Sequence, residues 1–191
     1  MGKRGGKKGR KTEKLPLREE DLTKIQNGAR RLESNSDDAV KMIKVLRYTG
    51  MHMSIPLEGR YHLREEIDPD EGDLMIVWDR TKKEGKDART SILKHHEIDF
   101  NVEEWAKAIR SRKRKKSRTY FWKLIKQSAE KGGIAGVSQM SFRHSIAVNL
   151  LKKGVQPALV QQILNCSAKT MARYGKYVDR DKNAVLKEVG Y

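Results

Sequence analysis

The sequence predicts a mainly helical domain with one small antiparallel β-sheet, which is an α+β fold. Apolar residues recur at helical spacing through most of the chain. Near the middle, two short apolar runs flank a polar turn, a pattern typical of a β-hairpin. Glycine or proline ends several of the periodic blocks. The 191 residues contain no internal repeat and match the length of one domain.

Two helices are predicted in the first third of the chain. The block Leu17–Glu33 carries four apolar residues on one face, which are Leu22, Ile25, Ala29 and Leu32. The second helix starts at Ser36, because a serine followed by two aspartates resembles an N-cap with acids in the first turn. It continues through Tyr48 and ends at Gly50.

The predicted sheet follows an acidic segment. Glu65–Asp73 is rich in carboxylates and contains a proline and a glycine, so we interpret it as a turn. Leu74–Trp78 and Ala88–Leu93 are predicted as two strands of a hairpin. The polar loop between them, Thr81–Asp87, is too long for a two-residue turn.

The second half of the chain is predicted to be helical. Two of its apolar blocks end on glycine, at Gly132 and at Gly154. The predicted helices are Val102–Arg112, Thr119–Lys131, Ser141–Lys153, Pro157–Leu164, Lys169–Tyr177 and Asn183–Val189.

The charge balance predicts a polyanionic partner. The chain has 42 basic and 25 acidic residues, a net charge of +17. Such a surplus costs self-repulsion unless a polyanion relieves it, and duplex DNA does so by releasing counterions from its phosphates. An anionic membrane surface fits less well, because the basic runs do not lie along amphipathic helices with a broad apolar face.

Two segments concentrate this charge. Residues 1–16 contain seven Lys or Arg and one acid, so we expect a disordered basic arm, with a purification or solubility tail as the alternative. Residues 17–191 form the remaining domain. The second segment has eight basic residues in twelve and is interpreted as a surface that contacts DNA phosphates: Lys107, Arg110, Arg112, Lys113, Arg114, Lys115, Lys116 and Arg118.

Composition also excludes several classes of protein. No apolar stretch approaches the ~18 residues of a membrane span, and no signal peptide is recognised at the start. Cys166 is the single cysteine, so a disulfide or a cysteine-rich zinc site cannot form within the chain. We therefore expect a cytoplasmic, DNA-associated protein without a membrane partner.

A specific motif lies near the C-terminal end. The stretch from Met140 to Val178 reads MSFRHSIAVNLLKKGVQPALVQQILNCSAKTMARYGKYV. It contains an Arg-His pair, a Leu-Leu pair, a glycine, an Ile-Leu pair and, 31 residues after Arg143, Tyr174. This order and spacing resemble the C-terminal half of the catalytic domain of tyrosine recombinases, the integrase family.

Two upstream segments agree with that resemblance. Tyr48-Thr49-Gly50 before a short helix resembles the first-arginine motif of the family, and the turn Lys82–Lys86 resembles the turn that holds its catalytic lysine. The resemblance covers roughly residues 17–180 and leaves no room for the separate N-terminal clamp domain of the family.

The resemblance implies a chemistry and a set of roles. In the family, a tyrosine hydroxyl attacks a DNA phosphodiester and forms a 3′-phosphotyrosyl bond, without a metal or other cofactor. Tyr174 matches the nucleophile, with Tyr177 as the competing candidate. Arg143 matches the second arginine, which stabilises charge on the phosphate oxygens. Lys83 matches the lysine that protonates the leaving oxygen.

Three positions of the implied site depart from the family pattern. His52 stands where the first arginine is usual, with Arg60 as a possible substitute for the missing guanidinium. Met140 stands where a histidine or lysine is usual. Cys166 stands where a histidine or tryptophan is usual, and Asn165 replaces the glycine before it. Neither methionine nor cysteine donates a strong hydrogen bond to a phosphate.

Three functions remain open on this evidence. The first is a weakly active recombinase that cleaves and rejoins duplex DNA. The second is a catalytically impaired accessory or regulatory protein that keeps the fold and binds DNA. The third is a plain helix-turn-helix protein using Leu159–Lys176, which explains neither the lysine turn nor the spacing from Arg143. The resemblance also implies self-assembly on DNA through the last predicted helix, Asn183–Val189.

Overall fold

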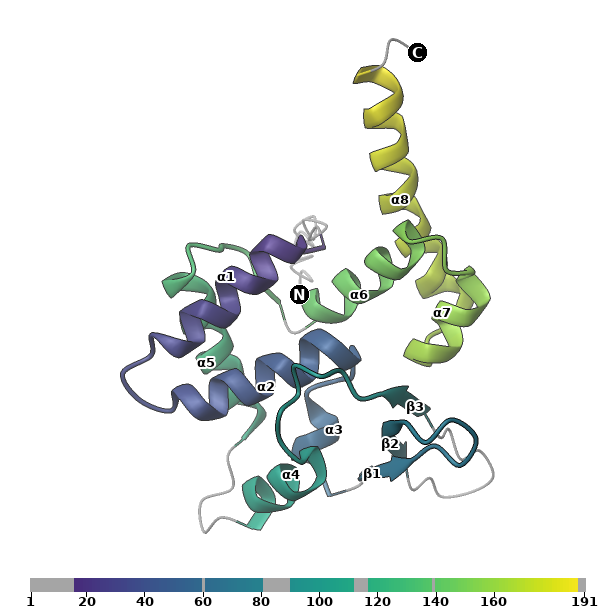
Figure 1. Cartoon of the computed structure of the whole chain (residues 1–191). Coiled ribbons are helices and arrows are strands. Elements are labelled where there is room, and N and C mark those ends of the chain that lie inside the picture. The colour runs from purple at the N-terminus through teal and green to yellow at the C-terminus, as the bar shows by residue number, and fades with distance from the viewer. Residues whose placement is uncertain (1–15, 60, 81–89, 112–116, 139, 189–191) are drawn as a thin grey trace, which may run out of the picture.

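The computed structural model describes residues 16–59, 61–80, 90–111, 117–138 and 140–188, and its fold agrees with the predicted class (Figure 1). Eight helices and three strands occupy these residues: α1 (Glu19–Arg30), α2 (Ser36–Thr49), α3 (Ser54–Leu57), β1 (Tyr61–Ile67), β2 (Leu74–Arg80), β3 (Thr90–Leu93), α4 (Val102–Ser111), α5 (Arg118–Lys131), α6 (Ser141–Lys152), α7 (Pro157–Leu164) and α8 (Ala168–Glu188).

The helices α1, α2 and α5 form the main apolar core. Ile25 of α1, Ile43 of α2 and Ile125 of α5 are fully buried there. The α1 and α5 backbones come unusually close at Gly28, where a Cβ would lie 2.0 Å from the carbonyl oxygen of Ser128. A side chain at this position would force the two helices apart, so glycine is required for this contact.

The end of α2 positions the candidate site. Gly50 has φ +63°, a left-handed conformation that glycine adopts without strain, and its N–H donates to the carbonyl of Leu46. A Cβ at Gly50 would lie 2.8 Å from Cδ2 of Leu164 and 3.2 Å from Cδ1 of Ile146. The glycine therefore ends the helix and also lets α6 and α7 pack directly against that end.

The sheet has three antiparallel strands in the order β1-β2-β3. The two strands of the predicted hairpin are present, but β1 occupies part of a segment that the sequence assigned to a turn. Only Leu63 of β1 is buried, so the strand shows no apolar alternation. Polar contacts hold it instead: Arg64 pairs with Asp79 at 2.7 Å, and Lys94 pairs with Glu65 at 2.9 Å.

The last three helices surround a second apolar cluster. Val148, Val160, Leu164 and Tyr174 are buried in it. The two predicted helices Lys169–Tyr177 and Asn183–Val189 are wrong as separate elements, because α8 runs without a break over 21 residues. The polar segment between them contains neither glycine nor proline, so nothing stops the helix. Beyond its contact with α6, α8 extends away from the rest of the domain (Figure 1).

No helix among the described residues has the length and apolar character that a membrane crossing requires.

Candidate DNA-cleavage site

Arg143 lies at the centre of the candidate site. It sits in the first turn of α6 and is 6% exposed. Its Nη1 donates to the carbonyl of Gly50 at 2.8 Å, and its Nη2 donates to the carbonyl of Leu164. Burial lowers the pKa of the guanidinium, but an arginine keeps its charge at neutral pH. One buried cation thus joins the ends of α2 and α7.

Tyr174 of α8 faces this cation. The residue is 2% exposed, and its hydroxyl lies within hydrogen-bonding reach of the Arg143 side chain. Burial raises the pKa of the hydroxyl, and the neighbouring charge of Arg143 lowers it in part. The hydroxyl and the guanidinium therefore meet in one buried cluster.

Cys166 belongs to the same cluster and follows the end of α7. Asn165 has φ +44°, and the N–H groups of Asn165 and Cys166 donate back to Gln162 and Gln161. This is a Schellman-type end, in which asparagine is the usual replacement for glycine. Burial raises the pKa of the Cys166 thiol, and the Arg143 charge opposes this rise. The thiol is therefore protonated and weakly polar at neutral pH.

His52 lies on the exposed side of the same site. It follows Gly50 by two residues and precedes α3. Although the residue as a whole is exposed, desolvation by nearby protein lowers the pKa of its imidazole, and the charges of Arg143 and Arg118 lower it further. The ring is consequently neutral at pH 7, where the family resemblance implies a fixed positive charge.

Comparison with known proteins decides the family. The model of the phage integrase family matches residues 16–184. The chain belongs to this family. No curated protein is similar enough in sequence to be matched.

Solved structures share the fold of this integrase-family chain. The XerH site-specific recombinase bound to palindromic difH substrate, in a post-cleavage complex, has a TM-score of 0.67 at 18% identity. The similarity covers 92% of this chain and 52% of the XerH chain, so the chain spans about half the length of that recombinase. XerA recombinase gives a TM-score of 0.60 at 18% identity over 94% and 67% of the two chains. The Tn1549 transposon integrase in complex with a circular intermediate DNA gives 0.57 at 14% identity over 94% and 68%.

Two further predicted catalytic residues are Met140 and Lys83. Met140 is the residue before α6, half-buried, and its backbone carbonyl accepts the N–H of His144 at 2.9 Å. Its side chain offers no polar hydrogen to a phosphate. Lys83 and the alternative residue Arg60 lie outside the described residues.

The sequence interpretation gave no role to His144. Its ring contacts the Tyr174 ring edge-to-face at 5.4 Å, and its Nδ1 is buried without a partner among the described residues. Burial lowers the pKa of His144, and the charges of Arg143 and Arg173 lower it further. The sequence signal that could have placed His144 in the site is its position directly after Arg143, on the helix that packs against α8.

The predicted basic surface is described only at its two ends. Lys107 is exposed on α4 and forms an ion pair with Glu103 at 2.5 Å, so the glutamate partly neutralises its charge. Arg110 is half-buried on α4, with its Nη1 atom fully covered. Arg118 is exposed at the first turn of α5, and its charge reaches His52. The five basic residues from Arg112 to Lys116 lie outside the described residues.

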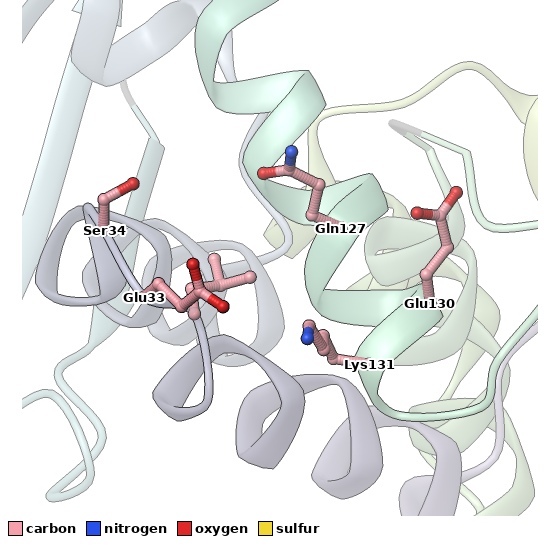
Figure 2. A pocket seen from close by; sticks show the side chains of 6 residues that line it. Glu33, Ser34, Gln127, Glu130 and Lys131 are labelled. Atoms are coloured by element: carbon pink, nitrogen blue, oxygen red, sulfur yellow. The ribbon is translucent and has the colours of Figure 1, made fainter.

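A cavity of about 400 Å³ lies between the α1–α2 connection and the end of α5 (Figure 2). Glu33 and Glu130 oppose Lys131 around its opening. It is at the end of α1 opposite to Leu17, whose N–H donates to Ser145 beside Arg143. The cavity is therefore separate from the candidate site.

Three histidines with lowered pKa values predict a pH dependence of stability. The folded pKa values of His52, His95 and His144 are lowered from 6.5, so the unfolded chain binds more protons below this pH. The contribution of these histidines to the free energy of unfolding should be complete above about pH 6.5. Below that pH the free energy of unfolding should fall, by at most ~1.4 kcal/mol per pH unit for each extra proton that the unfolded chain binds. Urea unfolding at several pH values measures this slope.

A matched pair of variants assigns the effect. His144→Gln should flatten the slope, whereas His62→Gln, at an exposed position on β1, should leave it unchanged. Equal slopes for both variants and the wild type would show that His144 does not contribute.

Proposed function

We propose that this chain binds duplex DNA and cleaves and rejoins it slowly through a 3′-phosphotyrosyl intermediate, with Tyr174 as the nucleophile. The observation that carries this proposal is the meeting of Tyr174 of α8 with Arg143 of α6, where the hydroxyl lies within hydrogen-bonding reach of the guanidinium and the ring contacts His144. A hydroxyl beside a fixed guanidinium is the minimal arrangement for attack on a phosphodiester.

In the proposed step, the Tyr174 oxygen forms a bond to phosphorus while the bond from phosphorus to the 5′ oxygen breaks. The hydroxyl releases its proton to water, and the leaving 5′ oxygen gains one, for which Lys83 is the proposed donor. Arg143 stabilises the charge on the non-bridging oxygens. The phosphotyrosyl bond conserves the energy of the phosphodiester, so attack by a 5′-hydroxyl reverses the step and rejoins the strand.

The partner is proposed to be duplex DNA. Two structures that share the fold, the XerH recombinase and the Tn1549 integrase, were solved as DNA complexes. The net charge of +17 supports the same partner for this chain. The extension of α8 away from the domain supports a further proposal, that copies assemble on DNA through this helix (Figure 1).

One set of observations favours a second candidate, a DNA-binding protein with impaired catalysis. Both Nη atoms of Arg143 already donate to backbone carbonyls, and Tyr174 is almost completely covered. His52 is uncharged at pH 7. In this state the site presents little positive charge to a phosphate, so cleavage requires the site to open first.

Trapping on a nicked duplex separates the two candidates. A nick next to the cleavage position releases a short fragment and prevents rejoining, so any phosphotyrosyl product accumulates. A covalent protein–DNA band in a denaturing gel supports the recombinase, whereas a native gel shift without this band supports the impaired binding protein.

Binding is expected to depend steeply on salt. If the arm and the basic run neutralise phosphates, the logarithm of the association constant should fall linearly with the logarithm of salt, by about 0.9 for each phosphate neutralised. Deleting residues 1–14, which carry seven basic residues and one acid, should flatten this slope. Fluorescence anisotropy with a labelled duplex measures both slopes, and an affinity that does not change with salt would contradict the phosphate model.

A further inference from the structure

Exposed apolar side chains gather at one end of the sheet. Ile67 is 70% exposed, Leu93 53% and Leu74 40%, and they are three of the four large apolar residues that the described part exposes. Ile67 is the cross-strand partner of Leu74, and Leu93 pairs with Met75. Exposed apolar side chains in a group mark protein interaction surfaces more often than scattered ones do.

This end of the sheet is acidic, in contrast to the whole chain. Residues 65–73 contain six acidic and no basic residues. The Asp68 carboxylate accepts the N–H groups of Asp70 and Glu71, which shapes the turn between β1 and β2. Within the residues that the structure describes, no salt bridge involves the four carboxylates of this turn. A negative surface repels DNA and attracts a basic protein segment.

An open cavity of about 540 Å³ adjoins the same surface. It lies between the sheet and the loop before α4 and is lined by Leu74, His96 and Phe100, among others. Lys94 in its wall is paired with Glu65, and both side chains are nearly buried. The cavity therefore has a mixed lining, in which Leu74, Ile98 and Phe100 offer apolar contact to an aliphatic side chain and the charge of Lys94 is already neutralised.

The acidic surface lies at one end of the β1–β2 ladder. Ile67 and Leu74 pair at this end, and Tyr61 and Arg80 pair at the other. Seven residues of extended chain span roughly 20 Å, so the acidic turn is far from the end at which β2 leaves the sheet.

We propose that this acidic end, residues 65–74 with Leu93, binds the basic arm, residues 1–16, of a second copy of this chain. The arm has seven basic residues and one acid, which complements the four acids of the turn at positions 68, 70, 71 and 73. It joins the described structure at Leu17, whose N–H donates to Ser145 of α6 at 2.8 Å. In Figure 1, α6 and the sheet lie on opposite sides of α2, so each arm starts away from the acidic end of its own copy.

This geometry gives head-to-tail association. Two different surfaces meet, so copies that exchange arms can form a closed pair or repeat into longer chains. DNA competes for the same arm because it is a far denser polyanion. The contact through the arm therefore forms without DNA and is lost when a duplex takes the arm, which leaves α8 free for the proposed assembly on DNA. The proposal does not depend on whether Tyr174 cleaves DNA.

Sedimentation velocity of the full chain at low salt and rising concentration tests the association. Ile67→Ser should weaken it by about tenfold, the loss expected for one buried aliphatic side chain. Replacing Lys7, Lys8, Arg10 and Lys11 by glutamine should weaken it at least as much. Leu159→Ser is the matched control, because Leu159 is 49% exposed but lies on α7. A duplex that is long enough for one copy only should return the wild type to single copies, because it takes the arm without giving room for assembly through α8.

Zero-length carbodiimide cross-linking of a mixture of light and heavy isotope-labelled chains identifies the contact. We expect cross-links between arm lysines and Asp70 or Glu71 that join a light chain to a heavy one. A monomer at all concentrations would overturn the proposal. Equal effects of Ile67→Ser and Leu159→Ser, or association that survives neutralisation of the arm, would overturn it as well.

Discussion

Tyr174→Phe is expected to abolish every covalent protein–DNA product while it leaves DNA affinity nearly unchanged. Phenylalanine lacks the oxygen that forms the bond to phosphorus, so no residual reaction remains through this position. The ring stays in place against His144, and the variant loses only the hydroxyl that faces Arg143. Loss of this contact should change the free energy of unfolding by about 1 kcal/mol or less.

The measurement is covalent yield on a nicked duplex, with anisotropy for affinity and urea unfolding for stability. Tyr177→Phe is the matched control, because Tyr177 lies one turn further along α8 and is half-buried in the same cluster. It should retain the covalent product. A product that survives Tyr174→Phe but disappears with Tyr177→Phe would reassign the nucleophile to Tyr177.

The sequence predicted the part of the site that local rules determine. The boundaries of α7 agree with the prediction, because Pro157 fixes the start and the left-handed Asn165 follows the end. The position of Arg143 in the first turn of α6 follows from the same reasoning. The family resemblance implied that Arg143 and Tyr174 share one site, and α6 and α8 do pack together.

Contacts between distant segments could not be predicted. The sequence does not show that the carbonyls of Gly50 and Leu164 both accept from Arg143. Every residue has a backbone carbonyl, so the residue types do not indicate which carbonyls accept. It also does not show that the charge of Arg118 reaches His52 across 66 positions of sequence. The sequence missed β1 for a related reason, since its residues are held by cross-strand ion pairs rather than by apolar alternation.

His52→Arg is expected to raise the rate of covalent product formation by about two orders of magnitude. Losing one charge-assisted contact to a phosphoryl transition state typically costs ~3 kcal/mol, and this substitution restores such a contact. Arginine adds five donors and a fixed charge where the imidazole is neutral. The new guanidinium lies near Arg143 and Arg118, which already lower the pKa of His52. The free protein should therefore lose some stability, and bound DNA should restore it.

Two variants separate the charge from its geometry. His52→Lys restores the charge without the planar fork and should give a smaller gain, since bidentate contact to a phosphate requires the guanidinium. Cys166→His adds one donor and should also give less than His52→Arg. Single-turnover trapping on the nicked duplex compares all three with the wild type. If none of them accelerates cleavage, the missing charge is not limiting. The slow step would then be release of Arg143 from the carbonyls of Gly50 and Leu164, which must precede its contact with the phosphate.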